Sequence, residues 1–258
     1  MIKPQFLKKQ FQKSIGAQST APFLRRFVIR IVDEVAQAHY GAEHPMKCTQ
    51  TAGAIQVLLA ELGIASRLTM GAVCFPKINS AGHFVGWSGF WEDDHHIWLT
   101  TQFYEVVDLS ISQQHDHPST EGEEMPTPAI WWDQAGGWPP IMRYLEDTFV
   151  DRIALSCPDE QTSYERFVAK VGVAFSSALS ERDVKDFTFK QLLMDVDQLN
   201  QWTETKHPWA TAALFVPEHQ VAFPAWIIER QEEIERALER NEEPASRLSN
   251  RLDLIDRT

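Results

Sequence analysis

The sequence has few cysteines, no long apolar run and no excess of basic residues, and each absence excludes a class of protein. Three cysteines in 258 residues are too few for a disulfide framework and fit a reducing compartment. No segment approaches the roughly 20 apolar residues that a membrane-spanning helix needs. The first 18 residues lack the apolar stretch of about 7–15 residues typical of secretory signals. We therefore expect a cytoplasmic protein with no membrane partner.

Acidic residues outnumber basic ones, 36 to 24, which gives a net charge of −12. Such a charge repels nucleic acids, so a nucleic-acid partner is not expected. The first 32 residues are the exception, because they hold seven basic side chains and no carboxylate. This basic start is either a docking arm for an acidic partner or a solvated helix face that pairs with the acidic half of the chain. The sequence does not indicate an oligomeric state.

Apolar residues make up 43% of the chain, enough for the core of one large domain or two modest ones. Residues 21–38 and 48–62 carry apolar side chains at helical spacing, and Gly63 after the second segment is typical of a helix C-terminus. Four short segments rich in aromatic and β-branched residues predict strands of an antiparallel meander: 66–75, 83–91, 95–103 and 104–111.

Residues 112–142 are rich in proline and are expected to form a loop, which marks a candidate boundary. The pattern beyond it is mainly helical, at residues 141–156, 160–179, 181–202 and 224–241, with a short strand pair expected at 212–223 and a frayed tail at the end. We expect residues 1–140 to form one core. Residues 141–258 are expected to form a mostly helical region, either appended to that core or part of the same domain.

Three residues stand where a nucleophile, a base and an orienting acid are needed. Cys48 begins a predicted helix, where the helix dipole and free N–H groups lower the pKa of a thiol. His96 and Asp108 fall on consecutive predicted strands. If these strands pair as a tight hairpin, the two side chains can meet on one face, and the carboxylate then orients the imidazole. The spacing permits a Cys–His–Asp triad, although ordinary core residues give the same three types.

The surrounding residues resemble the core of the transglutaminase-like, papain-related superfamily. From Cys48 to Gly71 the chain reads CTQTAGAIQVLLAELGIASRLTMG. This is similar to the family's nucleophile helix and the Gly-[Ile/Val]-x-[Ala/Ser]-Arg-x-x-x-Gly phrase that follows it. The tripeptide HIW beginning at His96 resembles the family's His-x-[Trp/Phe] strand, and EVVD ending at Asp108 resembles the end of its next strand. The resemblance covers about residues 40–112.

The resemblance implies an α+β fold with a transglutaminase-like or papain-like core, helices packed on a small antiparallel sheet and no cofactor. It also implies cysteine-dependent acyl chemistry at an amide or ester carbonyl, in which Cys48 attacks, His96 transfers the proton and Asp108 orients His96. Hydrolysis of a peptide or isopeptide bond in a peptide or protein substrate is the first expectation, because water needs no second binding site. Acyl transfer to an amine, as in a transglutaminase, and a non-enzymatic interaction module on the same fold are the alternatives.

Some assignments stay open. His95 and His96 point to opposite faces of a strand, and the HIW register favours His96. The backbone N–H of Cys48 is the first expected oxyanion donor, and the sequence does not identify a second one. Trp98 is a candidate substrate-binding residue, as are Trp131 and Trp132, which either line a cleft or anchor their segment to the core.

Other candidates are weaker. Cys74, on a predicted strand, and Cys157, in a predicted loop, are expected to be inert thiols. Arg67 either binds a substrate carboxylate or ties the helix end to the sheet. Residues 93–96 and 115–117 hold metal-ligand types, but their spacing matches no structural zinc site, so no metal is expected.

Overall fold

The computed structural model describes residues 1–79, 81–92, 94–110, 130–134, 141–187, 193–240 and 242. Its helical elements are α1 (Pro4–Ala17), α2 (Pro22–Tyr40), η1 (Gly41–Met46), α3 (Cys48–Glu61), α5 (Pro158–Glu181), η3 (Val184–Phe187), α6 (Val196–Glu204), α7 (Pro208–Ala213), α8 (Phe215–Glu218) and α9 (Ala225–Glu239). Its strands are β1 (Ser66–Ile78), β2 (Phe84–Phe90), β3 (His96–Thr101), β4 (Glu105–Asp108), β5 (Ile130–Gln134), β6 (Arg143–Val150) and β7 (Leu193–Met194). These strands form one sheet in which β5–β7 is the parallel pair and the other pairs are antiparallel. The fold is therefore α+β.

The long strand β1 is the centre of this sheet and pairs along both of its edges. β6 lies along one edge, with Tyr144 opposite Val73. β3 and β2 lie along the other edge, β3 beside the first part of β1 and β2 beside the last part. The expected meander is wrong in this respect, because the second and third strands follow one another along β1 instead of lying side by side. The strand β1 is thus long enough to pair with both β3 and β2 along one edge.

A tight turn at Gly63 joins α3 to β1. Gly63 has a φ of +78°, a conformation in which any side chain is strained. Its N–H donates to the Ala60 carbonyl at 3.0 Å, and the N–H of Ile64 donates to the Leu59 carbonyl at 2.8 Å. The expectation that Gly63 ends this helix is therefore confirmed, and the turn sends β1 back along α3.

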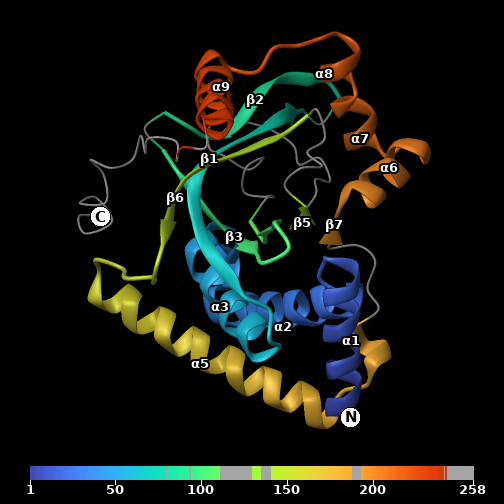
Figure 1. Cartoon of the computed structure of the whole chain (residues 1–258), viewed down its shortest axis with the longest axis vertical. Coiled ribbons are helices and arrows are strands. Elements are labelled where there is room, and N and C mark those ends of the chain that lie inside the picture. Colours follow the sequence, from blue (N-terminus) through green and yellow to red (C-terminus); the bar gives the residue numbers. More distant parts are fainter. Residues whose placement is uncertain are drawn as a thin grey trace.

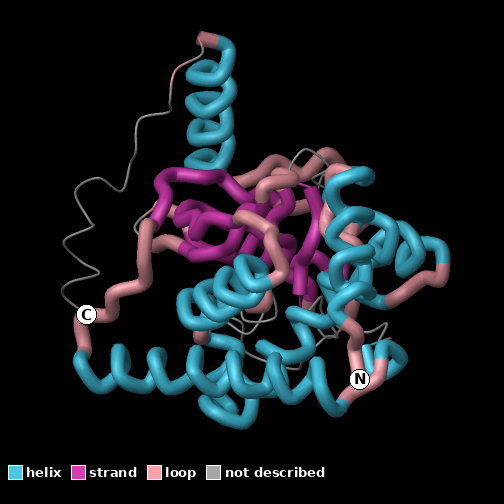
Figure 2. Tube along the Cα trace, turned by 60° about the horizontal axis from the view of Figure 1, so that its bottom comes forward, coloured by secondary structure: helices cyan, strands magenta, loops and turns pink. Residues whose placement is uncertain are grey.

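Helices lie on both sides of the sheet (Figure 1; Figure 2). α1, α2, α3 and α5 form a layer on one side, where Leu99 and Val107 of the sheet pack with Phe27 of α2. α6, α7 and α8 lie on the other side, where Trp98 and other sheet residues pack with Trp209 of α7. Ile227 of α9 packs instead with Ala72 and Cys74 of β1 in a separate, smaller cluster. The sheet therefore contributes to an apolar cluster on each face.

A buried ion pair links α2 to strand β4 of the sheet. The Arg25 guanidinium donates to the Glu105 carboxylate at 2.7 Å and to the Trp132 carbonyl at 3.0 Å. The same carboxylate accepts hydrogen bonds from Thr20 and Thr101. These donors replace water around a fully buried charge.

The basic start of the chain consequently divides into two parts. Arg25 belongs to the core, and Arg30 pairs with Glu34 on the same helix. The exposed remainder lies at the start and along α1, at Lys3, Lys8, Lys9 and Lys13. These lysines and the half-buried Arg26 remain available for either interpretation of the basic segment.

Several later segments differ from expectation. Residues 141–156, expected to be helical, contain the strand β6, because the backbone of this segment pairs with β1. The expected loop 112–142 contains β5, and its residues 112–129 and 135–140 lie outside the described residues. The expected strand pair at 212–223 is instead occupied by the end of α7 and by α8. Residues 181–202 hold short elements in place of one long helix.

The two halves of the chain share one sheet and one core. β6 pairs with β1, and α5 places Phe167 and Val171 in the same apolar cluster as Phe27 of α2 and Ile55 of α3. This arrangement favours the expectation that the region after residue 140 belongs to the same domain. Within the described residues, every helix is too short or too polar to span a membrane.

Candidate functional site

Three chain segments bring polar side chains to the same end of the sheet. α3 begins at Cys48, and the turn at its far end makes β1 antiparallel to it. β3 is antiparallel to β1 and so runs parallel to α3, which places its first residue, His96, beside the start of α3. β4 returns antiparallel and ends at Asp108. The topology thus brings together the three residues that the sequence singled out.

His96 and Asp108 form a buried hydrogen-bonded pair, with 2.8 Å between Nε2 of His96 and Oδ2 of Asp108. Burial alone would lower the pKa of His96, but the charge of Asp108, the hydrogen bond to it and the interaction with Cys48 raise this pKa to about 10. Burial alone would raise the pKa of Asp108, but the charge and hydrogen bond of His96 lower it. The pair is therefore an imidazolium and a carboxylate at neutral pH.

Cys48 is the least buried residue of this group, because it is half-buried at the start of α3 whereas His96 and Asp108 are buried. Burial alone would raise the pKa of its thiol, but the hydrogen bond and positive charge of His96, together with a hydrogen bond to Thr49, lower the pKa below its ordinary value. The Asp108 charge opposes this effect. Nδ1 of His96 is buried without a hydrogen-bond partner among the described residues, and because Nε2 is bonded to Asp108, Nδ1 is the ring nitrogen left for the thiol.

Tyr144 and Ser110 hold the carboxylate of Asp108 in place. The Tyr144 hydroxyl donates to Oδ2 at 2.6 Å, the same oxygen that accepts from His96. Ser110 donates to Oδ1 through its backbone N–H at 2.8 Å and its hydroxyl at 2.7 Å. Burial and the charge of Asp108 raise the pKa of Tyr144 well above its ordinary value, so this hydroxyl stays protonated and remains a donor.

Sequence reasoning missed both of these residues. Ser110 had a local signal, because a serine two residues after an aspartate commonly closes an Asx turn. Tyr144 had none, because it lies in a segment expected to be helical and reaches Asp108 from β6.

Aromatic rings enclose the imidazole. Phe90 stacks on His96 with 5.6 Å between ring centroids and 6° between planes, and Trp98 lies at 6.2 Å on the same strand. Gly71 stands opposite His96 on β1. A Cβ at Gly71 would collide with the Leu145 carbonyl and would lie 2.9 Å from the Trp98 ring. Glycine therefore allows β6 and this ring to approach β1 beside the site.

The register places His96, and not its neighbour His95, beside Asp108. His96 is a ladder partner of Gly71, whereas His95 lies between β2 and β3 and is half-buried. The favoured alternative from the sequence is therefore the one that the strand geometry supports.

The three tryptophans expected to contact substrate lie in the core. Trp98 is 2% exposed, and Trp131 and Trp132 are fully buried. Trp98 and Trp131 belong to the cluster on the α7 side of the sheet, and Trp132 belongs to the cluster beneath α2 and α3. This placement fits the alternative that the two β5 tryptophans anchor their segment. A substrate could contact these three tryptophan rings only if the core residues packed over them moved away.

The remaining candidates are dispersed. Cys74 is buried on β1, where burial raises the pKa of its thiol far above the ordinary value, and Cys157 is half-buried just before α5. Arg67 lies 3.4 Å from Glu146 of β6, which links β1 to its neighbour. Residues 93 and 115–117 lie outside the described residues. In the part of the chain that the structure does describe, no three His, Cys, Asp or Glu residues gather as metal ligands.

A thiol of lowered pKa beside an imidazolium that a carboxylate holds in place can act as a nucleophile with a proton carrier. No family model, no curated protein and no solved structure matches the chain. The interpretation of the site therefore depends on its own geometry.

Proposed function

We propose that the protein is a cysteine hydrolase that cleaves a peptide or isopeptide bond in a peptide or protein substrate. The observation that carries this proposal is the Cys48 thiol of lowered pKa, on a half-buried residue that begins α3, beside a His96 that is hydrogen-bonded to a buried Asp108. A thiolate and an imidazolium oriented by a carboxylate are what nucleophilic acyl chemistry requires.

In the first half-reaction, Sγ of Cys48 attacks the carbonyl carbon of the substrate. The tetrahedral oxyanion lies at the start of α3, where the Cys48 N–H and the positive end of the helix dipole stabilise it. When the intermediate collapses, the C–N bond breaks and the His96 imidazolium gives its proton to the leaving amine. The products are a thioester on Cys48, a free amine and a neutral His96.

In the second half-reaction, water attacks the thioester carbonyl while His96 takes one proton from that water. Collapse breaks the C–S bond, which releases the carboxylic acid and returns Cys48 to the thiolate. His96 is then again the imidazolium. Asp108 keeps its charge throughout and orients the imidazole.

The fold of this region is, as part of the same proposal, a transglutaminase-like core. The supporting observation is the order of the elements: a helix that begins with the cysteine, an antiparallel strand, a strand that begins with the histidine and a strand that ends with the aspartate. The sequence resemblance implies the same order.

An acyl-enzyme trap tests the proposal. The protein is mixed with p-nitrophenyl acetate, p-nitrophenol release is followed, and proteolytic peptides are analysed by mass spectrometry. We expect a burst, an acetyl group on the peptide that contains Cys48, and then slower turnover by water. Cys48→Ser should abolish all three. Cys157→Ser, which removes the other half-buried thiol, should change none of them.

Two results would contradict the hydrolase. An acetyl group that added glycine amide captures in preference to water would make the protein an acyltransferase. A Cys48 that no electrophile labels faster than a free thiol would favour a non-enzymatic interaction module.

A further inference from the structure

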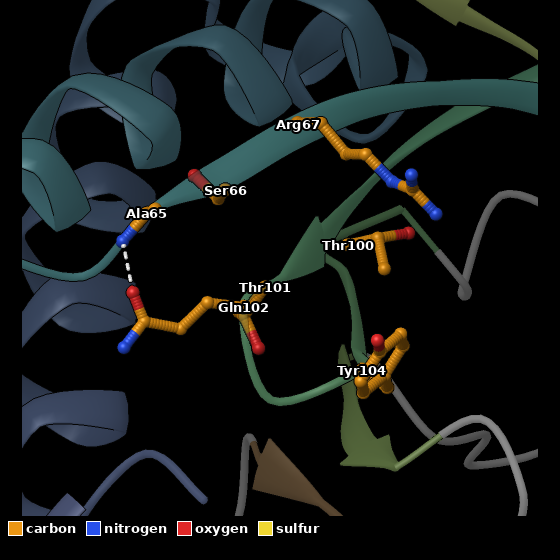
Figure 3. A pocket seen from close by; sticks show the side chains of 7 residues that line it. All are labelled: Ala65, Ser66, Arg67, Thr100, Thr101, Gln102 and Tyr104. Atoms are coloured by element: carbon orange, nitrogen blue, oxygen red, sulfur yellow. Dashed lines mark hydrogen bonds between the residues drawn. The ribbon is translucent and has the colours of Figure 1, made fainter. Parts of the chain in front are cut away.

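A pocket of about 300 Å³ opens at the other end of β3, away from Cys48. It is lined by the beginning of β1, the end of β3 and the turn that follows, including Arg67, Thr100 and Tyr104 (Figure 3). Because a strand rises about 3.3 Å per residue, Thr100 lies roughly 13 Å from His96. The pocket is therefore separate from the proposed catalytic residues.

Arg67 supplies positive charge at this pocket. Its side chain is 49% exposed, and its guanidinium lies over the ring of Phe149, 3.6 Å from the centroid, which fixes its plane. The contact with Glu146, at 3.4 Å, is long for a charged hydrogen bond and occupies one of the five guanidinium donors. Arg67 can therefore present an edge of N–H groups to an anion.

Tyr104 supplies a flat ring in a strained position. It ends the three-residue turn between β3 and β4 with a φ of +59°, where such turns usually carry glycine. Its side chain is 73% exposed, so burial does not account for this conformation. The exposed ring is therefore accessible to a ligand at the pocket that it lines.

Gln102 fixes the same turn to β1. Its side-chain oxygen accepts from the Ala65 N–H at 2.9 Å, and its own backbone N–H donates to the Ala65 carbonyl at 2.8 Å. Figure 3 shows the Gln102 side chain directed back to Ala65, whereas Arg67 and Thr100 extend to the opposite side of the strands. The turn that carries Tyr104 is thus tied to the beginning of β1 before any ligand arrives.

We propose that this pocket binds a small aromatic carboxylate, with the carboxylate on Arg67 and the ring against Tyr104. Arg67 is the single cationic side chain among the described lining residues, and the chain carries a net charge of −12, so a monoanion fits better than a phosphate dianion. The volume is at the lower end for small-molecule sites. A free aromatic acid and the C-terminus of a peptide that ends in an aromatic residue share this chemistry.

Calorimetric titration of the full chain with phenylacetate tests the proposal. We expect saturable binding. Phenylacetamide, which has the shape without the charge, should bind at least about tenfold more weakly. Cyclohexylacetate, which has the charge without the flat ring, should bind about threefold more weakly or worse. Tighter binding of acetyl-glycyl-phenylalanine than of phenylacetate would assign the site to a peptide C-terminus.

Two variants examine the residues themselves. Arg67→Gln should weaken phenylacetate binding at least about tenfold, whereas Arg152→Gln, at an exposed arginine just after β6, should leave it unchanged. Tyr104→Gly should weaken binding several-fold while raising the Tm by about 2 °C, because glycine relieves the strain.

The proposal is overturned if phenylacetamide binds as well as phenylacetate. It is also overturned if Tyr104→Gly, which is expected to fold at least as well as the native chain, binds phenylacetate undiminished. Cys48→Ser should bind phenylacetate like the native chain, because this site does not depend on the proposed hydrolase.

Discussion

Among single residues, Asp108 shows most clearly that the residues around His96 form an organised site. A buried carboxylate is unfavourable unless donors replace its water, and this one accepts from His96, Tyr144 and twice from Ser110. The shared oxygen Oδ2 fixes the imidazole relative to β6 as well as to its own hairpin. The orientation of His96 therefore depends on residues from both halves of the chain.

Removal of any member of the triad should reveal its role. Cys48→Ser and His96→Ala should each lower turnover of an activated ester by roughly 10⁴-fold or more, and the double variant should be about as inactive as either single one. Asp108→Asn should retain somewhat more activity, because it misorients the base without removing it. His95→Ala is the matched control. If His95→Ala loses activity and His96→Ala does not, the assignment of the base is wrong.

The reactivity of the thiols should follow their pKa values. The pKa of Cys48 is lowered, so its thiolate fraction should persist at a pH where an ordinary thiol is protonated, and limiting iodoacetamide should alkylate Cys48 before Cys74, whose pKa is raised by burial. His96→Ala removes the two largest interactions that lower the Cys48 pKa and should move the rate profile to higher pH. Mass-spectrometric mapping across pH checks this order. A profile unchanged by His96→Ala would show that the imidazole does not activate Cys48.

Tyr144→Phe should separate the positioning of Asp108 from the chemistry itself. Loss of the hydroxyl removes a hydrogen bond that helps to lower the pKa of Asp108. We expect kcat to fall about tenfold, because the Asp108 carboxylate loses one of the hydrogen bonds that hold it in place. We also expect the pH dependence of kcat to shift. Tyr164→Phe, at a half-buried tyrosine of α5, is the control and should leave kcat unchanged. A Tyr144→Phe variant with lower stability but an unaltered kcat and pH profile would assign Tyr144 a purely structural role.

Among the secondary-structure elements, those defined by local sequence patterns were predicted and those defined by distant pairing were not. The helices α2, α3 and α5 follow from apolar spacing within each segment, and β1 to β4 follow from composition and turns. β6 was mistaken for a helix, because its apolar residues recur at spacings that suit either structure and its strand form depends on pairing with β1. For the same reason, Cys48, His96 and Asp108 could be identified from the sequence, whereas Tyr144 could not.

The turn between α3 and β1 offers a test at this scale. Gly63→Val should lower the free energy of unfolding by about 1 kcal/mol or more, because a β-branched residue is strained at a φ of +78°. Gly16→Val is the control, because a Cβ at Gly16 would meet open space and its φ is not positive. Urea denaturation measures both. Equal effects of the two substitutions would show that the turn does not require glycine.

At the scale of the whole molecule, the ion pair between Arg25 and Glu105 joins the helical layer to the sheet on which the site is built. Arg25→Met should lower the free energy of unfolding by about 3–5 kcal/mol, because it leaves Glu105 buried and unpaired. Arg30→Met, which breaks an exposed pair on the same helix, should lower it by less than about 1 kcal/mol. Chemical denaturation of the two variants gives the comparison. A loss of similar size in both would show that the buried pair is not a main link between the layers.

The contact between Tyr144 and Asp108 can form only late in the synthesis of the chain. During translation, Cys48, His96 and Asp108 are synthesised before β6. This later strand supplies Tyr144 and pairs with the free edge of β1. At about 5–20 residues per second, the interval between Asp108 and the end of β6 lasts roughly 2–8 s. During that interval the nascent chain carries Cys48, His96 and Asp108 without the hydrogen bond from Tyr144. The arrangement seen around Asp108 is therefore complete only after β6 has been made and has joined the sheet.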